Sequence, residues 1–142
     1  MSKALNYLGL ARKAGLLELG EENTGAAIRA GKARLVMLAA DASDNARRRA
    51  AGFVHGTKTA MITVPFTKEE ISGETGKAGC SMAAFVDIGF AVSFVQTLCA
   101  DKPELAPVLE ELTEEKQRAD KRRQEAKAHE KNKKYGKRRK SV

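Results

Sequence analysis

The chain has 142 residues, of which 42% are hydrophobic and 5% aromatic, and it contains no Trp. This length fits one compact domain with an additional segment, and the core must consist of aliphatic side chains and a few Phe. No apolar run reaches the roughly 18 residues of a membrane span. The formal net charge of +8 favours a polyanionic partner, either nucleic acid or an anionic membrane surface.

Apolar runs alternate with helical patterns through the first hundred residues. We expect helices at about 2–15, 21–30, 43–53, 67–73 and 87–98, and strands at 16–19, 35–40, 61–64 and 82–86. The run Leu35–Ala40 is continuously apolar, as in a central strand that is buried on both faces. Strands separated by helices of this length predict a mixed or mostly parallel sheet sandwiched between helices.

Charge divides the chain near residue 100, which predicts a domain at 1–100 and a charged, basic tail at 101–142. From Lys116 to Lys140 there are 13 basic and 3 acidic residues. After Leu112 the non-polar side chains are alanines, Tyr135 and Val142. Such a segment buries too little surface to offset the entropy of ordering. We therefore expect a tail that is largely unstructured or helical only in patches.

Two cysteines, Cys80 and Cys99, lie in apolar stretches without a Cys-x-x-Cys motif or a nearby His. This pattern is typical of free thiols in a reducing compartment, and not of a disulfide or a metal site. The first residues also lack the apolar segment of a secretory signal. We therefore expect a cytoplasmic protein without a membrane partner and without a cofactor.

Gly20 precedes the predicted helix start Glu21-Glu22-Asn23. A glycine turn at this position leaves backbone N–H groups pointing outward, in front of the positive end of the helix dipole, where a phosphate or a guanine is favoured. The alternative is a purely structural role, in which Glu21 and Glu22 only stabilise the helix, because acidic residues in a first turn interact favourably with the dipole.

Several cations are candidates for phosphate contacts. Arg12 and Lys13 end the first helix just before the strand that leads to Gly20, and Lys32 lies in the turn after the second helix. Solvated surface charge is the alternative for Lys32, and we expect the run 47–49, three arginines, to form a solvated outer face.

Catalysis finds little support in the sequence. Asp41 and Asp44 follow a buried strand, where enzymes often place carboxylates, but both also suit helix capping. His55 and His129 have no Ser, Cys or Asp partner arranged for nucleophilic chemistry. We therefore expect a protein that is not an enzyme.

Residues 4–99 resemble the kink-turn RNA-binding family of large-subunit ribosomal proteins, and within it the small bacterial YlxQ-type branch. Each matching segment is weak by itself, and their order and spacing make the match specific. The segments are 8–15 (LGLARKAG), 20–22 (GEE), 27–29 (AIR), 31–36 (GKARLV), 39–43 (AADAS), 73–77 (GETGK) and 87–91 (DIGFA). The resemblance implies an α/β fold, a three-layer α-β-α sandwich around a mixed four-stranded sheet. It also implies a partner, a sharply bent RNA duplex with sheared G·A pairs, and possible association with the ribosome.

The RNA signature of that family is Gly-x-Asn-Glu, followed by a Lys one turn into the helix. Gly20 matches the glycine, whereas Glu22 stands at the Asn, Asn23 at the Glu and Ala26 at the Lys. A carboxylate at Glu22 can accept hydrogen bonds from guanine N–H groups, and the Asn23 amide can both donate and accept. In the family the loop before the last strand lies on the RNA side, which adds Lys77 to the candidates.

Two functions stay open at this point. The first is recognition of kink-turn or similarly bent structured RNA, ribosomal or ribosome-associated. The second is a protein-interaction or assembly module that keeps the fold without specific RNA readout, and the missing cation at Ala26 motivates it. A fragment of an RNA ribose methyltransferase ranks last, because the segment after residue 100 is too short and too polar to contain a catalytic domain.

Overall fold

The computed structural model describes residues 3–140, with side chains through residue 131. Helices alternate with strands up to the end of the last strand, and the chain then ends in helices. The elements in chain order are α1 (Lys3–Lys13), β1 (Leu17–Leu19), α2 (Glu21–Arg29), β2 (Leu35–Leu38), α3 (Asp44–Val54), β3 (Ala60–Thr63), α4 (Lys68–Thr75), β4 (Met82–Phe85), α5 (Ile88–Cys99), the short 3-10 helix η1 (Pro103–Leu105) and α6 (Ala106–Lys140).

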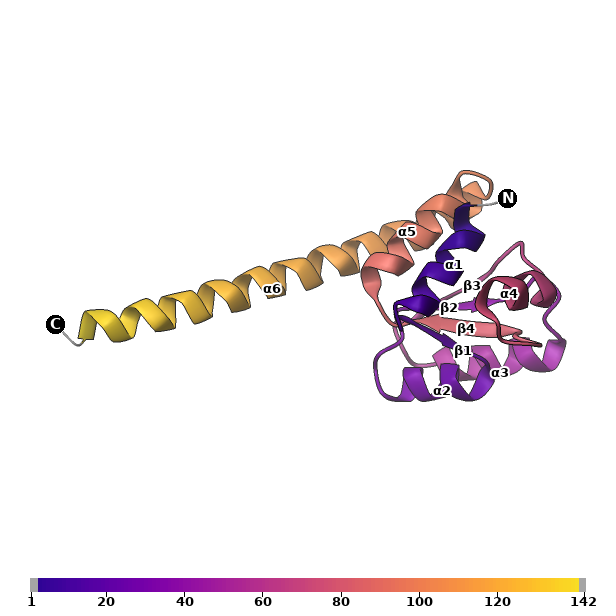
Figure 1. The fold of residues 1–142 in the computed structure, drawn as a ribbon, viewed down its shortest axis with the longest axis horizontal. Helices are drawn as coiled ribbons and strands as arrows, with labels where there is room; N and C mark the ends of the chain where they lie inside the picture. The colour runs from indigo at the N-terminus through magenta and orange to yellow at the C-terminus, as the bar shows by residue number, and fades with distance from the viewer. Residues whose placement is uncertain (1–2, 141–142) are drawn as a thin grey trace.

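The four strands form one mixed sheet in the order β1-β4-β2-β3. Strands β2 and β3 are parallel, and β4 runs antiparallel to both β1 and β2. Helices α2 and α3 cover one face of the sheet, whereas α1, α4 and α5 cover the other (Figure 1). The predicted three-layer α-β-α sandwich around a mixed four-stranded sheet is confirmed.

Side chains close the first turns of three helices where the sequence predicts helix starts. Ser43 accepts a hydrogen bond from the third backbone N–H of α3, and Asp87 does the same for α5. Thr67 and Glu70 form a reciprocal capping box at α4. Each such cap stabilises its helix by about 1 kcal/mol. The first predicted helix begins at Ser2, which lies outside the described residues.

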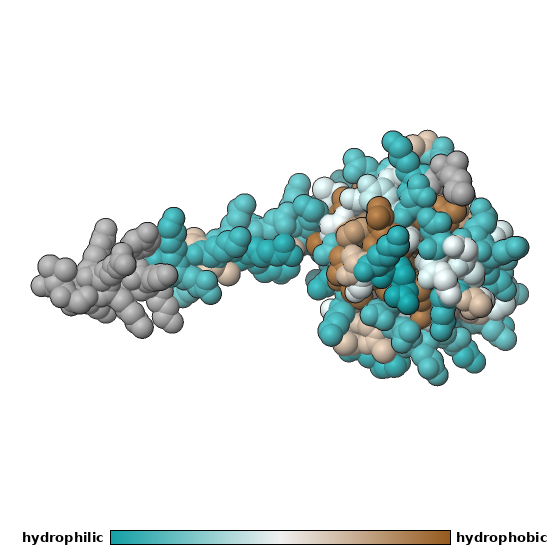
Figure 2. Space-filling model, in the orientation of Figure 1, coloured by the Kyte–Doolittle hydropathy of each residue, from teal (hydrophilic) through white to brown (hydrophobic). Residues whose placement is uncertain are grey.

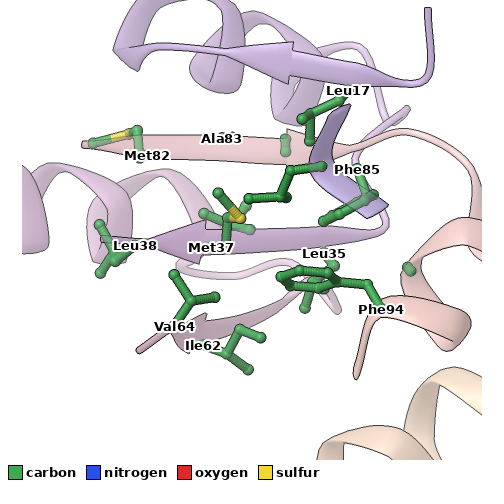
Figure 3. Packing of buried hydrophobic residues seen from close by; sticks show 14 of the residues in the cluster. Leu17, Leu35, Met37, Leu38, Ile62, Val64, Met82, Ala83, Phe85 and Phe94 are labelled. Carbon is green, nitrogen blue, oxygen red and sulfur yellow. The ribbon is translucent and has the colours of Figure 1, made fainter. Parts of the chain in front are cut away.

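The core lies between the sheet and its flanking helices. Strands β2 and β4 are buried at every position, as expected for central strands. Figure 3 shows Phe94 of α5 reaching toward the sheet beside Leu35. The rings of Phe85 and Phe94 lie with their centroids 4.9 Å apart. Both cysteines are free thiols, as predicted.

The predicted end of α4 near Gly73 is two residues too early. The helix continues to Thr75 and ends at Gly76, which adopts the left-handed conformation. The Thr75 hydroxyl donates to the carbonyl of Ile71 at 2.8 Å, and its side chain is buried, so packing extends the helix past Gly73.

The prediction of a largely unstructured tail is wrong, because α6 is a single helix of 35 residues. Its first turns pack against α5, and Leu112 is only 2% exposed within the core. A packed first segment removes the cost of helix nucleation, and the Glu-, Lys-, Arg-, Gln- and Ala-rich sequence that follows has high helix propensity. All side chains from 121 to 131 are exposed.

Helix α6 therefore projects away from the sandwich (Figure 1), and Figure 2 shows its described part covered by hydrophilic residues. Within residues 3–140, no helix combines the length and apolar character that a membrane crossing requires.

Candidate nucleic-acid interface

Strand pairing places several chain segments at one end of the sheet. Leu19 pairs with Ala83, and Leu38 pairs with both Met82 and Thr63. The carboxyl ends of β1, β2 and β3 therefore meet the amino end of β4. We call this end, formed by Gly20, the first turn of α2 and the loop 76–81, the Gly20 edge.

Gly20 adopts a backbone conformation that other residues rarely adopt, with φ 92° and ψ 168°. Glycine reaches this region without the strain that a Cβ brings. The N–H of Gly20 donates to the carbonyl of Met82 at 3.0 Å, which fixes the helix start to the end of β4. This bond sets the direction in which the first turn of α2 points.

The first turn of α2 presents free hydrogen-bond donors. Glycine has no capping side chain, and the first intrahelical bond runs from Thr24 N–H to the carbonyl of Gly20. Among the described residues, the N–H groups of Glu21, Glu22 and Asn23 have no acceptor. Lys77 lies beside them, with its Cε 3.7 Å from the position of a Cβ built on Gly20. Free donors, a helix dipole and a lysine are together suited to an anion.

The three polar side chains after Gly20 differ in their contacts. Glu21 forms a hydrogen-bonded ion pair with Arg49 of α3. The Asn23 amide nitrogen donates to the carbonyl of Leu19 at 3.0 Å, which leaves its oxygen and its second amide hydrogen available. Glu22 is exposed and has no side-chain partner among the described residues. Glu22 is thus the freest acceptor in the predicted signature.

A shallow pocket of about 480 Å³ lies along α2 and reaches α3. The two helices approach closely at Gly25, where an added Cβ would come within 2.9 Å of the Phe53 ring. Ala26 is exposed and lines the pocket. The other lining residues are Glu21, Glu22, Asn23, Arg29 and Phe53.

The run 47–49 does not form the uniformly solvated face that the sequence predicts. Arg47 donates to the carbonyls of Ala40 and Ala42 and to the hydroxyl of Thr63, so it holds the loop after β2 against β3. Arg49 pairs with Glu21, and this hydrogen bond raises the pKa of the Arg49 guanidinium above its ordinary value.

Arg49 is the residue of this interface that sequence reasoning missed. Its side chain stays 65% exposed, so its charge lies at the surface beside the Gly20 edge. The sequence carries one signal for it: Arg49 and Phe53 are four residues apart and therefore share one face of α3. Nothing local shows that this face meets α2.

Cys80 connects the loop 76–81 to the start of β4. Its thiol donates to the carbonyl of Met82 at 3.2 Å, and its side chain is buried. Burial raises the pKa of the Cys80 thiol, although backbone groups of Gly20 and Met82 and the charge of Lys77 partly oppose the shift. A protonated, buried thiol of this kind has a structural role.

The structure divides the predicted site residues into two groups. Gly20, Glu21, Glu22, Asn23, Ala26 and Lys77 lie on α2 or next to its start, at the Gly20 edge. Arg12, Lys13 and Lys32 lie at the opposite end of the sheet, because α1 ends where β1 begins and Lys32 follows the end of α2. Strand β1 alone separates the two ends by about 10 Å, at about 3.3 Å per residue.

No protein-family model matches the chain. Two solved structures have a similar fold. A protein of unknown function from Bacillus halodurans superposes with a TM-score of 0.63 at 25% identity, over 68% of this chain and 97% of that one. A 15.5 kD RNA-binding protein from Giardia lamblia superposes with a TM-score of 0.53 at 14% identity, over 66% of this chain and 79% of that one.

A curated relative gives a closer match in sequence. It is the RNA-binding protein YlxQ from Enterococcus faecium, which is 40% identical over 93 residues, or 63% of this chain and 84% of the relative. The aligned segment is almost as long as the sandwich, and the fold agrees with the one that the resemblance implies. On this identity and coverage, the chain belongs to the YlxQ family.

Proposed function

We propose that this protein binds RNA through the Gly20 edge and prefers a kink-turn or a similarly bent structured RNA, ribosomal or ribosome-associated. One observation carries the proposal: the unpaired N–H groups of the first turn of α2 lie beside Lys77 in a member of the YlxQ family. The name of the Enterococcus faecium relative, an RNA-binding protein, supports RNA as the partner. Without this relative, the geometry of the helix start would indicate only an anion-binding site.

Each group of the Gly20 edge has a distinct part in this proposal. The Glu22 carboxylate accepts hydrogen bonds from the N1 and N2 hydrogens of a guanine, and the free Asn23 oxygen accepts from a neighbouring base. Lys77 and the backbone N–H groups bind phosphate and set the position of the RNA. Arg49 neutralises Glu21, which reduces the repulsion between this carboxylate and the RNA backbone.

Helix α6 supplies a second, less selective attraction. The segment from Lys116 to Lys140 carries 13 basic and 3 acidic residues on a helix that projects from the sandwich (Figure 1). Cations on such an extended helix neutralise phosphates of any sequence. In this proposal α6 sets general affinity, and the Gly20 edge sets selectivity.

Deletion of residues 131–140 is expected to flatten the salt dependence of binding to any RNA. Each phosphate contact that is lost lowers the slope of log K against log salt by about 0.9 on a duplex. The side chains from 132 onward lie outside the described residues. The measured change in slope therefore gives the number of phosphate contacts that the deleted segment makes. The ratio of kink-turn to straight-duplex affinity should stay constant. An unchanged slope would place the end of α6 away from the RNA.

Titration against three RNAs tests the proposal as a whole: a kink-turn, the same duplex without its bulge, and a ribosomal RNA pool. We expect the kink-turn to bind more tightly than the straight duplex at equal length and equal salt. Equal, weak and salt-sensitive binding to all three would favour the alternative, an assembly module with the same fold. The exposed methyl group at Ala26, where the family has a lysine, is the observation behind that alternative.

A further inference from the structure

A cleft lies at the opposite end of the sheet from Gly20. It has a volume of about 690 Å³ and forms where α6 passes the end of α2 and the starts of β2 and β3. Its charged lining residues are Arg34, Lys58, Glu111, Glu115, Arg118 and Arg122. We call it the α6 cleft.

Four cations and two carboxylates line the α6 cleft, so its net charge is positive. Nη1 of Arg34 lies 3.6 Å from Oε1 of Glu115, so one of the two carboxylates is already in an ion pair. Lys58, Arg118 and Arg122 are exposed and have no ion-pair partner among the described residues. Three cations of the cleft are therefore available to an anion from solution.

The face of α6 that lines the cleft changes sign along the helix. Residues 111, 115, 118 and 122 are spaced by three or four positions and therefore share one face. The two nearer the start of the helix are glutamates, and the two farther along are arginines. Arg123 and Lys127 continue the positive charge beyond the cleft. The positive surface thus runs out of the cleft onto the projecting part of α6.

We propose that the α6 cleft binds the phosphate backbone of an RNA duplex that extends beyond the Gly20 edge. This proposal rests on the proposed function, since it assigns a second contact to the same RNA. The guanidinium groups of Arg118 and Arg122 suit bidentate hydrogen bonds to phosphate. A positive surface that continues along α6 fits an extended polyanion.

The lining of the cleft favours RNA over an acidic peptide. A docked peptide gains most of its binding energy from a few large side chains that fill well-packed, desolvated pockets. Of the apolar lining residues, Leu112 is 2% exposed and Ala33 is 6% exposed, whereas Ile28 and Ala60 are partly buried. Apart from Gly31, the lining residues that are exposed are charged or polar: Thr57, Lys58, Glu111, Arg118 and Arg122.

The position of the cleft sets a length requirement for the RNA. The nine residues of α2 separate the Gly20 edge from the cleft by about 13 Å, at 1.5 Å per residue. An RNA that covers only the Gly20 edge does not reach the cleft. An RNA whose arms extend beyond that distance places backbone phosphates beside Arg118 and Arg122.

The test compares full-length protein with the double variant Arg118→Gln/Arg122→Gln on two kink-turns, one with minimal arms and one with each arm extended by a helical turn. On the extended RNA we expect the salt slope to fall by about 2, at about 0.9 per phosphate contact. On the minimal RNA the slope should fall by less, because only the general attraction between α6 and RNA is weakened. The matched control Arg123→Gln/Lys127→Gln removes the same charge from α6 outside the cleft and should lower the slope by similar amounts on the two RNAs.

Three results would overturn the α6 cleft as an RNA site. They are an unchanged slope on the extended RNA, the same dependence on arm length for the control pair as for the cleft pair, and competition by poly-glutamate as strong as by a straight RNA duplex. The last would assign the cleft to acidic polypeptides. Failure of the proposed function gives a different result from these three. In that case the unmodified protein binds the minimal kink-turn and its bulge-less duplex equally.

Discussion

Ala26→Lys is expected to strengthen binding to a kink-turn about tenfold and to strengthen binding to a straight duplex less. Positions 22 and 26 are one helical turn apart on the same face of α2, and both line the pocket beside α3. If Glu22 contacts the bent duplex, a lysine at 26 meets the adjacent guanine or phosphate. The new charged hydrogen bond should contribute about 1–2 kcal/mol. Parallel titrations of both RNAs measure the difference.

Gly20→Val is the complementary change and should weaken kink-turn binding. A Cβ at this position meets only Lys77 Cε at 3.7 Å, so the cost arises from the backbone, whose φ is 92°. Such a conformation costs a β-branched residue about 1–3 kcal/mol, and the helix start is expected to shift away from the RNA.

Gly56→Val is the matched control for strain. Gly56 has φ 75°, has no atom within 4 Å of an added Cβ, and lies in the turn after α3, at the other end of the sheet. The Gly56→Val change should lower the thermal midpoint of unfolding without changing the ratio of kink-turn to straight-duplex affinity. Should Ala26→Lys help both RNAs equally while Gly20→Val harms neither, the start of α2 is not the RNA site, and the assembly-module alternative leads.

Leu112→Ala is expected to destabilise the full-length protein by about 2–5 kcal/mol, the range for a large aliphatic side chain removed from a core. Leu112 is 2% exposed and belongs to the same cluster as Leu98 and Phe94 of α5. We expect a chain of residues 1–100 to unfold cooperatively but with a stability loss of similar size. A chain of residues 1–120 should be close to full-length stability, because the side chains at 121–131 are exposed.

Denaturant unfolding of these chains and of Leu112→Ala measures the contribution of α6 to the domain. Leu10→Ala serves as the control, since Leu10 is 55% exposed and a surface change should stay within about 0.5 kcal/mol. Non-cooperative unfolding of residues 1–100 would contradict the proposed boundary and move it into α6.

Local chemistry in the sequence was enough to predict most of the sandwich. Thr67 and Glu70 form the capping box that their spacing predicts, and Asp87 caps α5. The first four residues of the continuous apolar run at 35–40 form β2, which is buried on both faces and ends at Leu38, two residues before the predicted end. These features depend on neighbours within a few residues or on a simple apolar pattern, so the chain specifies them before any long-range contact forms.

The tail shows the limit of that reasoning. Composition alone argues against an ordered segment after Leu112, and yet α6 is a helix of 35 residues. The deciding contacts are those of the buried Leu112 and the partly buried Val108 and Leu109 with the core, which order the first turns of α6 and offset the cost of helix nucleation. A few apolar residues at the start of a charged segment do not indicate by themselves whether a surface is available to bury them.

In the candidate interface too, some features follow from local sequence and others from long-range contacts. The sequence by itself determined the glycine helix start at Gly20, the acidic and amide side chains after it, and the absence of a cation at Ala26. Only the tertiary structure decided that Lys77 and Arg49 join this helix start while Arg12, Lys13 and Lys32 lie at the other end of the sheet. Their positions follow from strand order and from the close packing of α2 on α3. These contacts span 28 residues between Glu21 and Arg49 and 57 between Gly20 and Lys77, far beyond the range of local sequence patterns.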